Sequence, residues 1–253
     1  MYRYSGAGNT FVVLDGRTGD VSRYRLPETV QSVCAAEGTD GLMILSLSNR
    51  ADFRMEFFNP DGSTGMMCGN GGRCIVAFAR YLGISPSSGD GYVFEASDGL
   101  HDAWITDGDG LRCTVRLRMA EAKGLREVGG GWFIDTGTRH FVQFVDDVEA
   151  VDVERTGRSI RWSECFAPEG VNVNFVRIMP DGSIQVRTFE KGVERETLAC
   201  GTGAVASAVV ANHGNREIFT TTVHARISDL AVEHNAEGTF LVGPAENLGP
   251  CGQ

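Results

Sequence analysis

The stretch MMCGNGGRC, residues 66–74, places a cysteine and three glycines at the head of an apolar run. A second stretch, LACGTGA at 198–204, repeats the Cys-Gly-x-Gly centre and again precedes an apolar run. Each run reaches a glycine, Gly83 in one and Gly214 in the other, where a helix commonly ends. Both runs are apolar or small on nearly every face. We therefore expect two helices buried on all sides, each enclosed by a curved sheet.

The cysteines of these motifs, Cys68 and Cys200, stand where each expected helix begins. The N-terminus of a helix presents unpaired N–H groups and a partial positive charge, which attract anions and favour a thiolate. The glycines let a ligand approach the backbone closely. One such site is typical of a nucleophile, a redox thiol or a phosphate cradle. Phosphate is disfavoured because neither motif leads into the Gly-Lys-Ser/Thr of a P-loop.

The composition excludes several classes of partner. With 253 residues, 42% hydrophobic content and 22% charged content, the chain has the profile of an ordinary globular protein. Its formal charge of −10 argues against nucleic acid or an anionic membrane as the main partner. No run approaches the ~18 apolar residues that a membrane span needs. The first residues lack a signal-peptide core, so we expect a cytoplasmic protein.

Seven cysteines form an odd set scattered over a long chain, which is not a disulfide framework. The chain has no CxxC pair, and Cys68 and Cys74 are too far apart for an ordinary zinc knuckle, so no metal site is expected. We expect the cysteines to be reduced. Cys34, Cys113 and Cys165 should be buried as small apolar residues.

Segments rich in β-branched and aromatic residues dominate the rest of the chain and alternate with turn signals. The expected strands cover residues 11–15, 42–47, 53–58, 112–119, 172–179 and 183–189. A third helix is predicted from Pro27 to Ala36, with proline in its first turn and Gly38 just past its end.

The two halves of the chain resemble each other beyond the cysteines. GAGNTFVVLD at 6–15 and DTGTRHFVQFVDD at 135–147 each lead from a glycine-containing turn into an apolar strand. The period is longer than that of solenoid repeats, which favours duplication into two like domains. The charged and then glycine-rich stretch 120–132 predicts the boundary, giving domains 1–119 and 120–242.

Two such cysteines, one in each domain, suggest inversion at a carbon acid. If both thiols flank one ligand, one thiolate removes a proton and the opposing thiol returns one to the other face. Acid–base help contributes about 10²–10⁴-fold, so stabilisation of the developing charge by helix N–H groups is also needed. The pattern assigns the resting thiolate to neither cysteine.

Five stretches, in order from residue 6 to residue 204, together resemble the diaminopimelate epimerase family. They are GAGNTF (6–11), TDGLMIL (39–45), FFNPDGSTGMMCGNGGRC (57–74), VNVNF (171–175) and FEKGVERETLACGTGA (189–204). The resemblance implies a cofactor-independent (PLP-independent) isomerase that interconverts LL- and meso-diaminopimelate in lysine and peptidoglycan precursor biosynthesis. It implies an α/β (α+β) fold of two similar pseudo-twofold-related domains, each a curved mixed sheet around a central helix. It further implies a homodimer, and a return of residues 243–253 to the first domain.

The resemblance also implies roles for individual residues. Cys68 and Cys200 would be the acid/base pair. Backbone donors to the reacting carboxylate would come from Gly69, Asn70, Gly201 and Thr202. Substrate-binding side chains would be Asn9, Asn59, Thr138, Asn172, Glu190 and Lys191, with His140 as a supporting residue.

Two departures from the family pattern concern the distal end of the substrate. Thr138-Arg139-His140 stands where many members read Asn-Pro-His or Ser-Pro-His. Glu190-Lys191 stands where the family usually has Glu-Arg, and lysine keeps the charge but loses the bidentate fork that grips a carboxylate.

Two alternatives stay open at the level of sequence. The first is a racemase or epimerase of another amino acid, such as proline, hydroxyproline or a basic amino acid; Asn59 and Asn172 speak against it, because its distal pocket would lack such asparagines. The second is a thiol redox or small-anion-binding protein, since two facing thiols could also oxidise.

Overall fold

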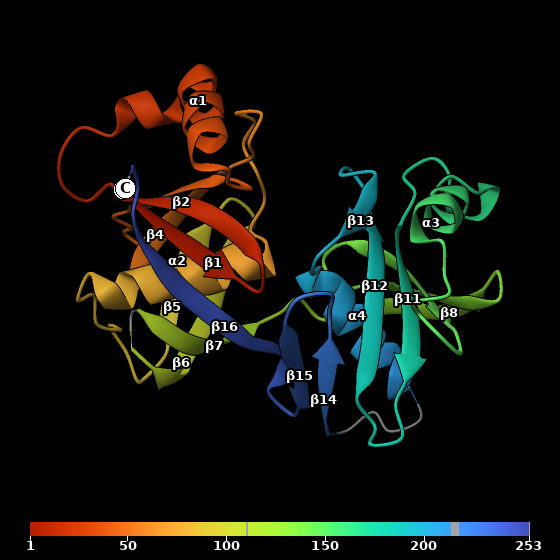
Figure 1. The fold of residues 1–253 in the computed structure, drawn as a ribbon. Helices are drawn as coiled ribbons and strands as arrows, with labels where there is room; N and C mark the ends of the chain where they lie inside the picture. Colours follow the sequence, from red (N-terminus) through yellow and green to blue (C-terminus); the bar gives the residue numbers. More distant parts are fainter. Residues whose placement is uncertain (110, 214–217, 253) are drawn as a thin grey trace. The chain divides into compact units, whose positions relative to one another are not determined.

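The computed structural model describes residues 1–109, 111–213 and 218–252, which form two compact units (Figure 1). Unit 1 comprises Met1–Leu117 with Gly243–Gln253, and unit 2 comprises Arg118–Val242. Each unit has its own set of strands, with β16 (Gly238–Pro250) contributing to both, and its own central helix. Among the described residues, no helix is long and apolar enough to cross a membrane.

The sheet of unit 1 closes on itself. Its strands follow the order β1 (Tyr2–Gly6), β2 (Asn9–Asp15), β3 (Leu42–Ser46), β4 (Phe53–Phe58), β5 (Tyr92–Ala96), β6 (Gly99–Gly108), β7 (Arg112–Arg118) and β16 (Gly238–Pro250). β16 pairs back with β1 through residues 246–250, which completes the ring. The sheet is mixed, because β2–β3 and β4–β5 are parallel pairs while β1–β2 and β3–β4 are antiparallel.

The helix α2 (Gly69–Tyr81) lies inside this ring and contacts β1, β2, β3 and β6 (Figure 1). Every residue from Gly69 to Ala79 is buried, which confirms the expectation of a helix enclosed on all sides. A Cβ at Gly6 would lie 2.5 Å from the Asn70 carbonyl oxygen, so glycine lets β1 approach the first turn of the helix. Gly83 takes a left-handed conformation with φ of 72° just past the helix end, as predicted.

A second helix of unit 1, α1 (Pro27–Glu37), follows a single 3-10 turn at Ser22–Arg25. Val30 and Cys34 face the sheet and join a cluster with Val12 and Ile44. The predicted helix at 27–36 is confirmed, with Gly38 left-handed at its end. The strands predicted from pattern also agree with the structure to within two residues at each end.

The sheet of unit 2 contains β8 (Lys123–Val128), β9 (Gly131–Asp135), β10 (Arg139–Phe144), β11 (Asn172–Ile178), β12 (Ile184–Glu190), β14 (Phe219–His224), β15 (Asp229–Asn235) and the first part of β16. The order across the sheet is β8-β9-β10-β11-β12-β14-β15-β16. β10–β11 and β12–β14 are parallel pairs, so this sheet is mixed as well. The short strand β13 (Arg195–Thr197) pairs with the end of β12.

The helix α4 (Gly201–Ala211) is the counterpart of α2 and contacts β9, β10, β11, β12, β14 and β15. Eight of its residues are buried, including both glycines of its first turn. The helix ends at Ala211; the expected terminal residue Gly214 lies outside the described residues. A mixed α/β fold with curved sheets around central helices is thereby confirmed.

The sequence pattern did not indicate α3 (Val153–Arg161), which packs against β11 and β12. Its buried residues, Val153, Gly157 and Arg161, recur every four residues on one face, and Ile160 packs against the same core cluster as Val153. Asp152 caps its N-terminus by accepting from the backbone N–H of Arg155 at 3.0 Å. The helix is therefore held by its cap and by the packing of this narrow face, which contains a glycine and an arginine beside its apolar side chains.

One further expectation differs from the structure. Cys34 and Cys113 are buried as expected, but Cys165 is exposed. It lies in the 3-10 turn Glu164–Phe166, where Phe166 takes the buried position. The stretch 120–132, where the sequence predicts the domain boundary, forms β8 and its turn into β9, in which Gly129 and Gly130 both adopt the positive φ that a tight hairpin requires. The two compact units divide just before this stretch, between Leu117 and Arg118.

Candidate active site

Cys68 is the N-cap residue of α2. Its backbone is extended, and its sulfur accepts a hydrogen bond from the N–H of Gly71 at 3.3 Å. Its carbonyl accepts from the N–H of Gly72 at 2.8 Å, which starts the helical ladder. The half-buried thiol therefore lies in the field of the first-turn N–H groups, which stabilises a thiolate.

Cys200 has the same position at the start of α4 and is also half-buried. Its sulfur lies 3.5 Å from the hydroxyl oxygen of Thr202, and its carbonyl accepts from the N–H of Ala204 at 2.8 Å. A Cβ at Gly203 would lie 2.5 Å from Oδ1 of Asn174, so only glycine allows the helix start to rest on β11. Each unit thus carries a cysteine at the N-terminus of its central buried helix.

A buried arginine lies one turn into α2. The side chain of Arg73 is fully buried and donates to the carbonyl of Gly69 at 3.1 Å, to Oδ1 of Asn70 at 2.8 Å and to the carbonyl of Pro244 at 3.3 Å. Burial lowers the pKa of the Arg73 guanidinium, which nevertheless remains a cation at neutral pH. A positive charge therefore lies in the interior below the first turn of this helix.

The Arg73 contact fixes the orientation of two asparagines. With its Oδ1 facing Arg73, Asn70 turns its amide nitrogen toward Oδ1 of Asn9, at 2.6 Å. Asn9 in turn donates to Oδ2 of Asp40 at 3.2 Å, and the N–H of Thr10 donates to the same oxygen at 2.9 Å. Two of the predicted site residues, Asn9 and Asn70, are thus brought together.

Asn59, at the end of β4, belongs to the loop that leads to Cys68. Its amide nitrogen donates to the hydroxyl of Ser63 at 3.0 Å, and its backbone accepts from the N–H of Gly62 at 2.9 Å. The structure thus shows Asn59 as the first residue of a tight turn.

In unit 2 the predicted residues around Cys200 form one hydrogen-bonded group. His140 is fully buried; its Nε2 lies 2.9 Å from the hydroxyl of Thr138 and 3.0 Å from that of Thr202. Its Nδ1 lies 3.1 Å from the amide nitrogen of Asn174. Burial lowers the pKa of His140 to about 3, so the imidazole is neutral at physiological pH.

Asn172, at the start of β11, links two strand ends. Its amide nitrogen donates to the carbonyl of Arg139 at 3.1 Å and lies 3.4 Å from the hydroxyl of Thr138. Its Oδ1 accepts from the backbone N–H of Lys191 at 2.8 Å. This places the Glu190-Lys191 pair at the same end of the sheet as Thr138.

The two side chains of that pair differ in environment. Glu190 is half-buried, and burial raises the pKa of its carboxyl group. The side chain of Lys191 is exposed. Arg139, for which the sequence suggested no role, forms an ion pair with Glu169.

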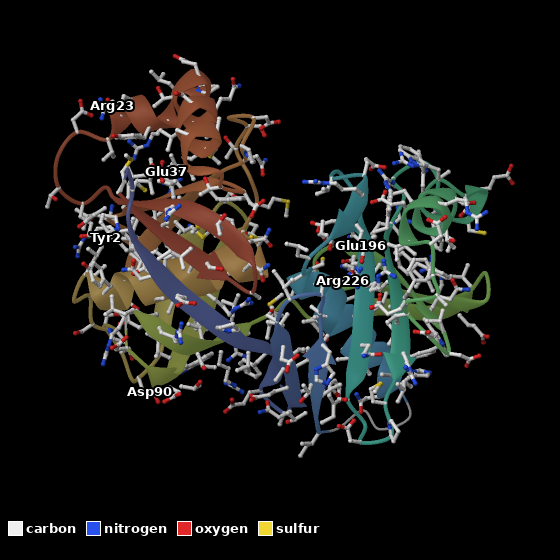
Figure 2. The ribbon with its side chains drawn as sticks, in the orientation of Figure 1. Tyr2, Arg23, Glu37, Asp90, Glu196 and Arg226 are labelled. Atoms are coloured by element: carbon white, nitrogen blue, oxygen red, sulfur yellow. The ribbon has the colours of Figure 1, made fainter. Side chains whose placement is uncertain are left out.

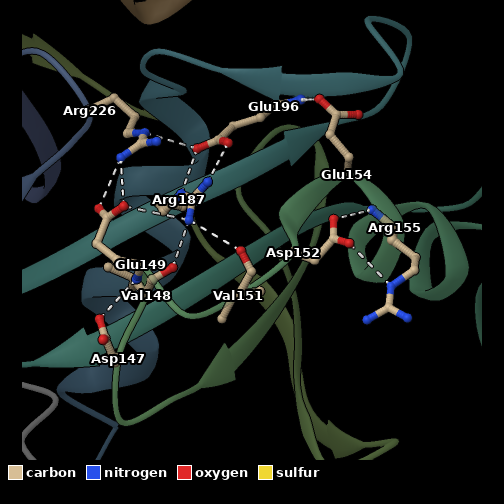
Figure 3. A network of polar contacts seen from close by, with 10 residues as sticks. All are labelled: Asp147, Val148, Glu149, Val151, Asp152, Glu154, Arg155, Arg187, Glu196 and Arg226. Atoms are coloured by element: carbon tan, nitrogen blue, oxygen red, sulfur yellow. Dashed lines mark hydrogen bonds and ion pairs between the residues drawn. The ribbon is translucent and has the colours of Figure 1, made fainter.

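A network of charged side chains supports the strand that leads to Cys200 (Figure 3). Arg187 of β12 donates twice to Glu196 of β13, each time at 2.7 Å, and once to the carbonyl of Val148 at 2.8 Å. Arg226 lies beside Glu196 at 3.2 Å (Figure 2), and its backbone N–H donates to the carbonyl of Leu198 at 3.2 Å. Leu198, two residues before Cys200, is therefore held in place by its hydrogen bond with Arg226.

Sequence reasoning missed two residues of these groups, Arg73 and Asn174. Each is a polar side chain at an inward position of an otherwise apolar element, which is the one signal that could have revealed it. The described residues contain no cluster of three or more His, Cys, Asp or Glu side chains that could hold a metal ion.

The sequence model of a known family, described as diaminopimelate epimerase, matches residues 1–122 and 132–248. The chain belongs to the diaminopimelate epimerase family. The resemblance inferred from the five stretches is thereby confirmed, and membership in this family makes the chain an isomerase.

Relatives support this membership. The diaminopimelate epimerase of Chlorobaculum tepidum is 43% identical over 214 residues, covering 81% of this chain and 80% of the relative. That of Flavobacterium psychrophilum is 36% identical over 255 residues, covering 97% and 96%. Among solved structures, a hydroxyproline epimerase from Agrobacterium vitis matches with a TM-score of 0.68 at 15% identity, covering 98% of this chain and 88% of that one. At this identity the likeness is one of fold.

Proposed function

We propose that this member of the diaminopimelate epimerase family converts LL-diaminopimelate to meso-diaminopimelate without a cofactor, with Cys68 and Cys200 as acid and base. The observation that supports it most is the repeated position of the two cysteines, each at the N-terminus of a central buried helix. Names of relatives at 36% and 43% identity support the substrate. Such an enzyme would serve lysine and peptidoglycan precursor biosynthesis.

The chemistry requires both thiols to reach opposite faces of one α-carbon. The thiolate takes the α-hydrogen as a proton, and the bonding pair delocalises into the neighbouring carboxylate. The opposing thiol then delivers its proton to the other face of the carbon. The first cysteine ends as a thiol and the second as a thiolate, so a turnover in the reverse direction starts from the product state.

The helix N-termini supply the second part of the rate enhancement. Backbone N–H groups of Gly69, Asn70, Gly201 and Thr202 would bind the carboxylate and stabilise its added charge. Acid–base catalysis alone contributes about 10²–10⁴-fold, whereas each preorganised donor can add about 2.7–4 kcal/mol in a dry site. Both contributions are needed for a carbon acid as weak as an amino acid.

The polar residues at the sheet ends would bind the rest of the substrate. Asn9, Asn59, Thr138 and Asn172 carry uncharged donors and acceptors, while Glu190 and Lys191 carry opposite charges that suit a distal ammonium and carboxylate. By the same family membership we propose that units 1 and 2 are the two epimerase domains, and that the enzyme is a cytoplasmic homodimer. Sedimentation equilibrium of the purified chain tests the last point.

Solvent-isotope exchange tests the activity. In heavy water under reducing conditions, LL-diaminopimelate should gain deuterium at an α-carbon while the LL and meso forms equilibrate, as followed by mass spectrometry and chiral chromatography. Exchange into proline, hydroxyproline or a basic amino acid, and none into diaminopimelate, would select a racemase instead. No exchange into any amino acid would leave the thiol redox or anion-binding alternative.

Substitution of each cysteine tests the mechanism. Cys68→Ala and Cys200→Ala should each abolish inversion, because each removes one of the two proton carriers. Cys165→Ala is the matched control, since it makes the same chemical change at an exposed cysteine that lies in the 3-10 turn Glu164–Phe166 and not at a helix start. Full turnover by either alanine variant would refute the two-thiol mechanism.

A further inference from the structure

The side chain of Asn174 has one allowed orientation. It is fully buried on β11, and its amide nitrogen lies 3.1 Å from the carbonyl oxygen of Phe141. A carbonyl can only accept, so the NH₂ group of Asn174 must face it. Oδ1 of Asn174 then accepts from the hydroxyl of Thr188 at 2.9 Å. The donor side of this amide is therefore fixed by a backbone group.

This orientation determines the tautomer of His140. The same NH₂ group of Asn174 lies 3.1 Å from Nδ1 of His140, so Nδ1 must accept. The ring is fully buried and neutral, and its single proton therefore resides on Nε2. Nε2–H is directed at the hydroxyls of Thr138 and Thr202, at 2.9 and 3.0 Å.

The direction of the hydrogen bonds continues from His140 to Cys200. Thr138 donates its hydroxyl hydrogen to the hydroxyl oxygen of Thr202 at 3.1 Å. The oxygen of Thr202 therefore faces two donors, Thr138 and Nε2–H of His140. Its own hydrogen points elsewhere, and the sulfur of Cys200 lies 3.5 Å away. The hydroxyl of Thr202 is thus oriented as a donor to that sulfur.

We propose that Asn174 is a positioning residue that, through His140 and Thr202, directs a hydroxyl hydrogen bond onto Cys200 and stabilises its thiolate. The proposal rests on the proposed function only for the catalytic role of the Cys200 thiolate. The direction of the hydrogen bonds involves residues of unit 2 alone. Cys68 depends on a different donor, the backbone N–H of Gly71. The two cysteines, which look alike in sequence, thus differ in at least one hydrogen-bond partner, a backbone N–H for Cys68 and a hydroxyl for Cys200.

The tautomer is measured first, on the substrate-free protein. In a long-range ¹H–¹⁵N correlation spectrum of the wild type, His140 should show an unprotonated Nδ1 and a protonated Nε2. Its signals are assigned by their loss in His140→Gln. In Asn174→Asp the carboxylate can only accept, so Nδ1 should become protonated. A wild-type ring with its proton on Nδ1 would overturn the proposal without any variant.

The effect on the thiol is measured next, as the rate of alkylation of Cys200 by iodoacetamide at pH 7, followed on its peptide by mass spectrometry. Thr202→Val removes the donor and keeps the side-chain shape. It should slow alkylation about tenfold, since a hydrogen bond to a charged group contributes about 1.5 kcal/mol or more.

The matched control is Thr136→Val, which makes the same chemical change in a side chain that donates to the backbone carbonyl of Thr202 at 3.0 Å rather than to the relay. Its rate should equal that of the wild type. An unchanged rate in Thr202→Val, or an equal loss in both variants, would overturn the proposal. Because no substrate is present, these outcomes are independent of whether diaminopimelate is epimerised.

Discussion

Protonation of His140 should couple the stability of unit 2 to pH. The ring is fully buried, and burial lowers its pKa from 6.5 to about 3. The unfolded chain takes up a proton near pH 6.5, whereas the folded ring stays neutral until the pH approaches 3. Between these values the unfolded state binds more protons. The free energy of unfolding therefore falls as the pH falls below about 6.5.

The size of the effect follows from the two pKa values. At pH 5 nearly all unfolded chains carry the His140 proton and nearly no folded chain does, so the loss of stability is about 2 kcal/mol. At pH 3 the loss is about 4 kcal/mol. Above about pH 7.5 the ring is neutral in both states, and the effect vanishes.

Urea unfolding of the wild type and of His140→Gln at pH 7.5 and pH 5 measures this contribution. Fluorescence of Trp132 and Trp162, both in unit 2, reports the transition. The other four histidines of the five are present in both proteins and cancel in the difference. The wild type should be the more stable protein at pH 7.5, and its advantage should shrink by about 2 kcal/mol at pH 5. An advantage of the same size at both pH values would show that folded His140 titrates normally.

Four further substitutions test the packing that supports the site. Gly203→Ala should destabilise unit 2 by about 1–3 kcal/mol or more, since its Cβ would lie 2.5 Å from Oδ1 of Asn174; thermal unfolding equal to the wild type would contradict the close approach. Arg73→Met should lower the free energy of unfolding in urea by about 1–3 kcal/mol, because neutral acceptors lose a donor. Asn70→Leu should lower it by more, because it takes an acceptor from a buried cation. The reverse order would refute this account. Arg187→Lys should cost about 1–3 kcal/mol, because lysine cannot reproduce the two bonds to Glu196, and a stability within about 0.5 kcal/mol of the wild type would count against a role for the network.

The local sequence was sufficient to predict a helix or strand where the residues of that element themselves decide its structure. The helices α1, α2 and α4 follow from proline, cysteine and glycine at their ends and from apolar or small residues between them. The helix α3 was not predicted from the sequence, because its buried face combines Val153 with Gly157 and Arg161. The residues that these three contact come from other elements. Arg161, for instance, bonds to Glu194, which is 33 residues away in the chain.

In the candidate site, too, the sequence identified single residues, whereas the tertiary structure decided which of them are in contact. His140 and Thr202 could be named from the family motifs, but their contact joins residues 62 apart in sequence. Asn174 meets His140 only because β10 and β11 pair in parallel, with His140 opposite Asn172. No pattern in either strand specifies that register, so the tautomer of His140 could not be predicted.

The sequence by itself determined the chemistry at the two helix starts, because a cap and the N–H groups that face it come from the same few consecutive residues. It therefore specified both cysteines, both glycine turns and the burial of both helices. Tertiary structure decided which side chains complete each cysteine's surroundings, that His140 is buried and neutral, and in which direction its hydrogen bonds run. Those properties depend on groups from separate strands, and their free energies arise only when folding removes water from between them.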